Sequence, residues 1–180
     1  MATGKTTVSR RLAEALGRRV WDSDEMIEAR TGKTVAQLWE EGGEPAYRLL
    51  ETEALDAALD AALRAEPPGI VAAAGGVVLS VANRVLLQRA SEDGAVVVWL
   101  RADPAVLASR VEPGDHRPLL RDDPLGTLTR LSAEREPLYG EVADRALDVG
   151  TATVEETVDT VLREVAAVAA ERCCDRELPK

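Results

Sequence analysis

The sequence predicts an α/β domain in which helices cover both faces of a parallel β-sheet, a three-layer α/β/α sandwich. Short apolar runs alternate with longer amphipathic segments, as in sheets whose parallel strands are joined by helices. Residues 70–74 and 95–100 are apolar at every position, which is typical of strands buried on both faces. Acidic residues and glycines follow the predicted strands, and ligands bind at this edge of such sheets.

Length and charge limit the class of protein. The chain has 180 residues, and we expect one domain over residues 1–171 and a frayed tail over 172–180. Its 22 basic and 32 acidic residues give a net charge of −10. Nucleic acids and anionic membranes need a basic surface, so we expect neither as a partner. A small anionic ligand can still bind at a local cluster of Arg and Lys, and we treat the chain as a monomer.

The cysteines and the hydropathy pattern indicate the compartment. Cys173 and Cys174 are adjacent, so they provide neither a disulfide framework nor the spacing of metal ligands. The sequence contains neither a signal-peptide pattern nor an uninterrupted apolar stretch of about 18 residues. We therefore expect a cytoplasmic protein without a membrane span.

The first third of the chain contains helix signals around one short strand. The spacing of Val8, Leu12 and Leu16 predicts an amphipathic helix, and Val20-Trp21 predicts a strand ending at Asp22. Thr and Gly residues then mark helix starts and stops. The helices expected next are a short one around 26–29 that ends by Gly32, one from the Thr34 cap to Gly42-Gly43, and a long Ala-rich one over 44–64.

The rest of the chain continues the alternation. Strand 70–74 leads into Gly75-Gly76, a pattern expected where a buried strand enters a backbone turn. Residues 112–124 are charged, contain Pro and Gly, and predict a mobile lid. The other expected elements are helices over 80–90, 104–111 and 125–135, strands over 95–100 and 146–149, and a last helix capped by Thr153.

The first residues carry the most informative motif. In the phosphate-binding pattern G-x-x-x-x-G-K-[ST], backbone N–H groups hold phosphates, the Lys reaches the β and γ oxygens, and the hydroxyl binds Mg²⁺. Gly4, Lys5 and Thr6 fit its end, Thr7 follows, and a helix N-terminus here suits an anion. A surface Lys beside a Gly turn is the alternative interpretation. The opening Gly, and the strand that normally precedes the loop, would fall before Met1.

Two carboxylates follow the first predicted strand. Asp22 and Asp24 permit a structural interpretation, in which Asp24 caps the next helix. In the functional interpretation, one carboxylate faces Mg²⁺ together with the Thr6 hydroxyl, since Mg²⁺ needs few protein oxygens. The other would orient or deprotonate an attacking hydroxyl.

Two arginines permit two interpretations each, and a third has one. Arg48 and Glu51 lie three residues apart on a predicted helix, where a solvated ion pair is the ordinary case. The same pair could be an Arg fork, held by Glu51, that binds a substrate carboxylate, and Arg135 permits the same alternatives. Arg117 in the predicted lid could close over a transferring phosphoryl group. To His116 beside it we assign no role.

In order along the chain, these residues resemble the shikimate kinase family, small-molecule kinases with a P-loop fold of the nucleoside-monophosphate-kinase type. The resemblance covers roughly residues 3–165 and keeps the family's order and similar spacing. The matching motifs are Gly4-Lys5-Thr6-Thr7, Asp22-Ser23-Asp24, Tyr47-Arg48-Leu49-Leu50-Glu51, Ala74-Gly75-Gly76, Arg117-Pro118-Leu119-Leu120 and Arg135-Glu136-Pro137-Leu138-Tyr139.

The resemblance implies ATP-dependent phosphorylation of the 3-hydroxyl of shikimate, in the route to chorismate and aromatic amino acids. Mg²⁺ is then the cofactor and ATP the co-substrate. The implied roles on the nucleotide side are phosphate binding by Gly4, Lys5, Thr6 and Thr7, metal binding by Thr6 and Asp22, closure over the transferred phosphate by Arg117, and stacking on adenine by Arg110.

On the acceptor side, the resemblance implies that Asp24 orients the shikimate hydroxyls and is the candidate base. Arg48 and Arg135 would clamp the shikimate carboxylate, and Gly75 and Gly76 would line the ring. The implied catalytic residues are Lys5, Asp24 and Arg117. Trp39 and Tyr47 match aromatic positions near the substrate pocket, although core packing explains them equally well.

The chain departs from the family pattern at two places. The family usually has three glycines where this sequence has Ala74-Gly75-Gly76. The resemblance also places the strand expected before Met1 at the centre of the sheet, so we expect a truncated N-terminus and a missing central strand. The alternatives are a gluconate-type kinase and a non-catalytic relative that binds nucleotide or shikimate.

Overall fold

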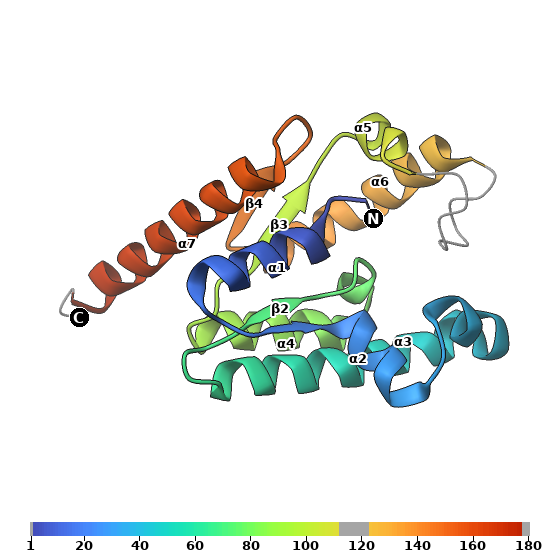
Figure 1. The fold of residues 1–180 in the computed structure, drawn as a ribbon, viewed down its shortest axis with the longest axis horizontal. Helices are drawn as coiled ribbons and strands as arrows, with labels where there is room; N and C mark the ends of the chain where they lie inside the picture. Colours follow the sequence, from blue (N-terminus) through green and yellow to red (C-terminus); the bar gives the residue numbers. More distant parts are fainter. Residues whose placement is uncertain (1, 112–122, 178–180) are drawn as a thin grey trace.

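The computed structural model describes residues 2–111 and 123–177 of the chain (Figure 1). Helices and short parallel strands alternate along the sequence, as predicted. The elements are α1 (Lys5–Leu16), β1 (Val20–Asp22), α2 (Ser23–Thr31), α3 (Val35–Arg64), β2 (Ile70–Ala72), the 3-10 turn η1 (Val77–Leu79), α4 (Val81–Glu92), β3 (Val98–Arg101), α5 (Pro104–Ser109), α6 (Pro124–Val142), β4 (Arg145–Asp148) and α7 (Val154–Glu177).

The helices cover both sides of the strands, which gives the predicted three layers (Figure 1). On one side, α1 and α7 pack Val8 and Val161 against Val98 and Leu147 of the strands. On the other side, α3, α4 and α6 form a second apolar cluster with β2. Apolar burial on both faces of the strand layer is what holds a parallel sheet in this class of fold.

The strands form two separate parallel pairs instead of one sheet. In the first pair, Val20 of β1 lies opposite Ile70 of β2. In the second, Val98 of β3 lies opposite Arg145 of β4. Within residues 2–111 and 123–177, no strand pairs with both β2 and β3. The parallel direction predicted for the strands is confirmed, whereas the continuous sheet is not formed by the described residues.

Two helices extend beyond the predicted limits. The segment expected to end near residue 135 continues as α6 to Val142, although it contains Pro137. Leu138, Tyr139 and Val142 pack into the cluster formed with α3 and α4, and this burial outweighs the local cost of proline. In α3, the break expected at Gly42-Gly43 is a kink, because Gly43 has φ 70° and ψ 179°.

The last helix, α7, continues through residues 172–177, where the sequence predicts a frayed tail. The Arg172 guanidinium donates hydrogen bonds to the carbonyl oxygens of Ser91 and Ala95 and to Asp144 Oδ1. These contacts connect α7 to the end of α4 and to the residues that precede β3 and β4. Across the described residues, no helix is long and apolar enough to cross a membrane.

Candidate active site

The loop before α1 and the end of β1 meet through Thr6 and Asp22. Gly4 lies at the N-terminus of α1 with a left-handed φ of 80°, and no side chain caps this helix end. The Thr6 hydroxyl donates to Asp22 Oδ2 at 2.9 Å. One hydroxyl and one carboxylate are therefore adjacent, as expected for Mg²⁺, which binds hard oxygen atoms and completes its shell with water and substrate phosphates. The described residues contain no cluster of three acidic, His or Cys side chains, and such a site needs none.

Asp22 also caps α2. Its Oδ1 accepts from the backbone N–H of Asp24 at 3.0 Å and lies 3.5 Å from the N–H of Glu25. The capping residue is thus Asp22, and the structural interpretation that Asp24 caps this helix is wrong. The two carboxylate oxygens of Asp22 serve different partners, because Oδ2 faces Thr6 while Oδ1 fixes the helix start.

Asp24 does not cap the helix, and its carboxylate contacts Tyr47. The Tyr47 hydroxyl donates to Asp24 Oδ1 at 2.8 Å, and the tyrosine ring is buried. Burial raises the pKa of Asp24, while the Tyr47 hydrogen bond and the nearby Lys5 charge oppose that rise. Burial and the Asp24 carboxylate also raise the pKa of Tyr47, so this hydroxyl stays protonated and donates. A carboxylate with a raised pKa in a pocket is a candidate general base.

Ser23, between the two acids, positions them relative to β2. It is fully buried, and its Oγ accepts from the backbone N–H of Ala74 at 3.0 Å. This bond ties the end of β1 to the turn that begins with Ala74 and Gly75. This contact was not predicted, because a Ser between two acidic residues is its only trace in the sequence.

Arg48 is held by two carboxylates. Its Nη1 lies 2.9 Å from both oxygens of Glu51, and its Nη2 lies 2.9 Å from Glu44 Oε1. Only 1% of Glu51 is exposed, so the pair does not lie on a solvated face as the ordinary interpretation assumes. Burial raises the pKa of Glu51, and the Arg48 charge opposes the rise. Glu44, the second partner, was not predicted.

Arg135 lies on the other side of the Gly75-Gly76 turn. Its Nη1 donates to the Gly75 carbonyl at 3.0 Å, and Tyr139 donates to the same oxygen at 2.7 Å. Arg135 is 7% exposed, and its Nε has no hydrogen-bond partner in the described part of the chain. A Cβ added at Gly76 would lie 2.0 Å from Arg48 Nη1, so a side chain at this position would displace the Arg48 guanidinium from the turn. The two arginines therefore meet at one turn.

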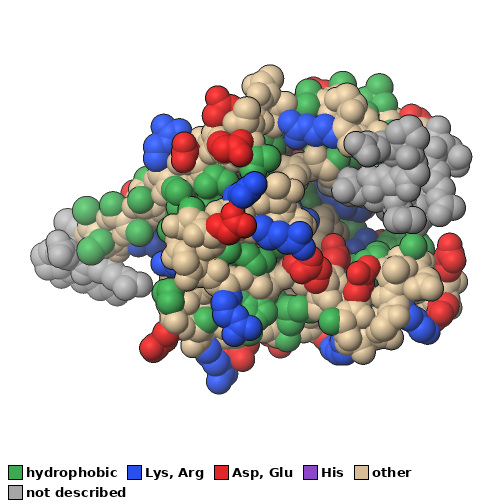
Figure 2. Space-filling view, viewed as in Figure 1, with side chains coloured by type: hydrophobic (Ala, Val, Ile, Leu, Met, Phe, Trp, Pro, Cys, Tyr) green, Lys and Arg blue, Asp and Glu red, His purple; other side chains and the backbone are tan. Residues whose placement is uncertain are grey.

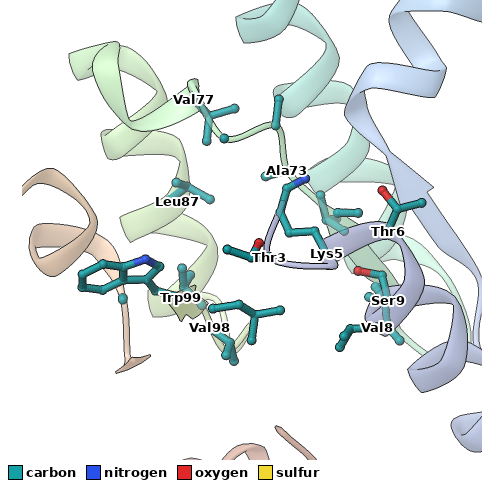
Figure 3. Close-up of a pocket in the computed structure, with 18 of the residues that line it drawn as sticks. Thr3, Lys5, Thr6, Val8, Ser9, Ala73, Val77, Leu87, Val98 and Trp99 are labelled. Carbon is teal, nitrogen blue, oxygen red and sulfur yellow. The ribbon is translucent and has the colours of Figure 1, made fainter. Parts of the chain in front are cut away.

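A cavity of about 1050 Å³ connects these parts. It is lined by the loop residues from Gly4 to Thr7, by Asp24, by Gly75 and by Arg135. Figure 3 shows Lys5 pointing into this cavity toward Ala73, with Thr6 directed to the opposite side. Figure 2 shows both basic and acidic side chains around the hollow on this face. The cavity lining includes Lys5 and Arg135, whose positive charges can attract an anionic ligand to a protein whose net charge is −10.

Thr7 lines the cavity from the first turn of α1, where it is exposed. The other predicted residues lie apart from this cluster. Arg110 is exposed at the end of α5, and its Nη2 donates to the carbonyl oxygens of Val149 and Gly150. Arg117 and the expected lid over 112–124 fall almost entirely outside the described residues, of which only 123 and 124 belong to that range.

The fold and site together define a P-loop kinase that acts on a small molecule. The Gly4-Lys5-Thr6 segment precedes a helix, the Thr6 hydroxyl lies 2.9 Å from the Asp22 carboxylate, and a second carboxylate, Asp24, lines the cavity near two arginines. The family model described as "Shikimate kinase" matches residues 1–166. The chain belongs to the shikimate kinase family, and it is accordingly a small-molecule kinase that uses ATP with Mg²⁺.

Individual relatives agree with this assignment. The shikimate kinase of Caulobacter vibrioides is 38% identical over 170 residues, which cover 93% of this chain and 80% of that protein. The shikimate kinase of Thermobifida fusca is 40% identical over 164 residues, which cover 91% of this chain and 90% of that protein. The structure of the Acinetobacter baumannii shikimate kinase in complex with shikimate matches with a TM-score of 0.84 and 32% identity, covering 93% of this chain and 89% of that one.

Proposed function

We propose that this chain transfers the γ-phosphoryl group of ATP to the 3-hydroxyl of shikimate, giving shikimate 3-phosphate and ADP. The observation that carries the proposal is the meeting of Arg48 and Arg135 at the Gly75-Gly76 turn, of which Gly75 and Arg135 line the same cavity as Asp24. Two guanidinium groups suit a carboxylate, and a nearby carboxylate suits a hydroxyl. Shikimate carries both groups.

On the nucleotide side, Gly4 to Thr7 would bind the phosphates of ATP through the backbone N–H groups at the start of α1. Lys5 would neutralise the β and γ oxygens. Thr6 Oγ1 and Asp22 Oδ2, already 2.9 Å apart, are the two oxygens that would hold Mg²⁺, directly or through water. A Mg²⁺ ion held there would supply positive charge that offsets the negative charge developing on the phosphate oxygens.

On the acceptor side, Asp24 would orient the attacking hydroxyl and accept its proton. The described contacts engage only Oδ1 of this carboxylate, so Oδ2 is available to the substrate. The hydroxyl oxygen forms a bond to the γ-phosphorus while the bond from that phosphorus to the bridging oxygen of ADP breaks. Because little covalent chemistry is left for the protein, its contribution is positioning and charge stabilisation.

The arginine clamp would hold the substrate carboxylate. Glu51 and Glu44 fix the Arg48 guanidinium, and the Gly75 carbonyl fixes that of Arg135. The unpartnered Arg135 Nε adds a reason for a ligand here, because a buried donor gains free energy when it finds an acceptor. Arg117 as the lid residue and Arg110 as the adenine contact are further parts of the proposal, as are the monomeric state and the cytoplasmic setting.

A coupled ATP assay tests the proposed reaction. We expect ADP release with shikimate and none above background with gluconate, and product identified as shikimate 3-phosphate by mass spectrometry. Turnover with gluconate and not with shikimate would contradict the proposal.

The second candidate is a non-catalytic relative that binds shikimate. One observation favours it. The strands form two separate pairs and Lys5 points into the cavity between them, whereas a catalytic Lys at this position would reach the β and γ oxygens of ATP. In that case shikimate would raise the melting temperature without any ADP release, because a ligand that binds only the folded state stabilises it. The two readouts, turnover and melting temperature, separate the candidates.

A further inference from the structure

The two carboxylates that contact Arg48 differ in how much of each is exposed to water. Glu51 is 1% exposed, so breaking its contact with Arg48 would leave a buried charge without a partner, which is costly. The Glu44 side chain is 52% exposed, and an exposed ion pair contributes little to stability. If one of the two carboxylates gives way to a ligand, it is therefore Glu44.

Glu44 contacts Arg48 with one oxygen for two donors. Its Oε1 accepts from Arg48 Nε at 3.2 Å and from Nη2 at 2.9 Å. A ligand carboxylate can instead offer one oxygen to each donor, which gives two parallel hydrogen bonds and a stronger contact. Arg48 Nη2 also borders the turn, because a Cβ placed on Gly76 would lie 2.9 Å from it. The donors that Glu44 occupies are thus next to the turn at which the proposed arginine clamp lies.

Other contacts hold the Arg48 guanidinium in place without Glu44. The guanidinium lies over the rings of Trp39 and Tyr47, 5.4 and 5.8 Å from their centroids, and cation–π contacts of this kind are attractive. Both oxygens of Glu51 accept from its Nη1. With both carboxylates ionised, the group of Arg48, Glu44 and Glu51 has a net negative charge, which repels a carboxylate ligand. Release of Glu44 removes that repulsion and leaves Arg48 positioned.

The kink in α3 places Glu44 at the start of a helical segment. Gly43 has φ 70° and ψ 179°, a conformation that favours glycine, and helical backbone resumes after it, four residues before Arg48. A helix start presents N–H groups and partial positive charge, so a glutamate at this position remains stabilised after it leaves Arg48. The exchange of Glu44 for a ligand carboxylate therefore loses little.

We propose that Glu44 holds the place of the substrate carboxylate on Arg48. It occupies the Nε and Nη2 donors before the substrate binds and gives them up when the substrate carboxylate arrives. This inference rests on the proposed function, in which Arg48 and Arg135 hold the carboxylate of shikimate. Glu44 is a positioning residue, because it acts through Arg48 and has no contact with the reacting atoms. It competes with an anionic ligand and has no effect on a neutral one.

Binding of shikimate without nucleotide, measured by calorimetry, tests the sign of the effect. Glu44→Gln keeps an oxygen acceptor and removes the charge. We expect its Kd for shikimate to fall about two- to fivefold, the range that corresponds to an exposed ion pair. The neutral methyl ester of shikimate should bind this variant and the unaltered protein equally. Glu41→Gln is the matched control and should leave both Kd values unchanged, because Glu41 lies three residues earlier on α3, pairs with Lys33 and is 57% exposed.

A second measurement follows Glu44 itself in the unaltered protein. The ¹³C NMR signal of its side-chain carboxyl carbon is assigned by its absence from Glu44→Gln. When shikimate is added, we expect this signal to move toward that of a hydrated glutamate, because the carboxylate exchanges Arg48 for water. The carboxyl signal of Glu41 should stay in place, since its partner Lys33 is not displaced.

Three results would overturn the inference: a Kd for shikimate that is unchanged or higher in Glu44→Gln, an equal gain with the ester or with Glu41→Gln, or a Glu44 signal that stays in place as shikimate binds. A higher Kd would mean that Glu44 only orients Arg48. Failure of shikimate to bind the unaltered protein would overturn the inference and the proposed function together. Tighter binding by Glu44→Gln, without ADP release by the unaltered protein, would support the inference and contradict the kinase reaction alone.

Discussion

The hydroxyl of Tyr47 on α3 donates a hydrogen bond of 2.8 Å to Asp24 on α2, and this contact joins a buried aromatic ring to the proposed base. Burial raises the pKa of Asp24, and the Tyr47 hydrogen bond is the largest of the effects that oppose the rise. The Tyr47 hydrogen bond therefore favours the ionised form of a buried carboxylate, and it engages only Oδ1 of Asp24. Four predictions concern this site.

Replacing Tyr47 with Phe removes the hydroxyl and keeps the ring. Without this donor the pKa of Asp24 should rise further, so the acidic limb of the kcat/KM profile should move to higher pH. Titration of the Asp24 carboxyl carbon by NMR should move in the same direction. The carboxyl of exposed Asp60 is the internal reference and should not change. An acidic limb at the same pH in both proteins would contradict the role given to Tyr47.

Replacing Arg135 with Ala should raise the KM for shikimate and leave ATP binding nearly unchanged. A hydrogen bond to a charged group contributes about 1.5–3 kcal/mol, which corresponds to an increase in KM of roughly 10- to 150-fold. Arg130→Ala is the matched control, because Arg130 lies five residues earlier on the same helix, α6, and its side chain is 65% exposed. Equal KM values for shikimate in the two variants would exclude Arg135 from the clamp.

Replacing Asp24 with Asn should abolish turnover and stabilise the fold at neutral pH. The pKa of Asp24 is raised in the folded protein, so ionisation favours the unfolded state. The free energy of unfolding therefore loses a contribution as the pH rises from below the ordinary value of 3.8 through the raised value. At pH 7 the variant should melt on the order of a few degrees higher, and the difference should vanish in acid. Asp60→Asn, on an exposed site, should show no such crossover.

Replacing Thr6 with Val removes the hydroxyl that lies 2.9 Å from Asp22. We expect the apparent affinity for Mg²⁺, measured from the rate at fixed ATP, to fall at least about tenfold, as when metal ligands are lost or misplaced. Thr6→Ser restores the oxygen and should recover most of the affinity. If Ser and Val behave alike, the hydroxyl does not serve the metal.

The sequence predicted the elements that depend on local pattern. The alternation of apolar runs and amphipathic segments located β1, β2, β3 and β4 within a few residues, because strand burial leaves a direct trace in composition. It also selected Thr6, Asp22, Arg48 and Arg135, which the structure brings around one cavity or its margin.

Features that depend on contacts between distant parts of the chain could not be predicted from the sequence. Which Asp caps α2 depends on backbone angles at one residue, and Asp22 adopts the extended conformation that a cap requires. Residue spacing in the sequence also does not predict which side chains from different elements come into contact. The examples are the Ser23 hydrogen bond with Ala74 and the Tyr47 hydrogen bond to Asp24. The second carboxylate on Arg48, that of Glu44, was likewise not predicted. The extension of α6 past Pro137 likewise depends on tertiary burial.

The contacts of Arg172 affect the order in which the chain can fold during synthesis. Its guanidinium joins segments 28 to 81 residues earlier in the sequence, including Asp144 before β4 and Ala95 before β3. The contacts of Arg172 with the segments before β3 and β4 can therefore form only after residue 172 has left the ribosome. Contacts of such long sequence separation are costly in loop entropy and tend to form late. We therefore expect the part of the molecule that carries β3 and β4 to complete its packing late in a growing chain and to be exposed to chaperones and proteases until then.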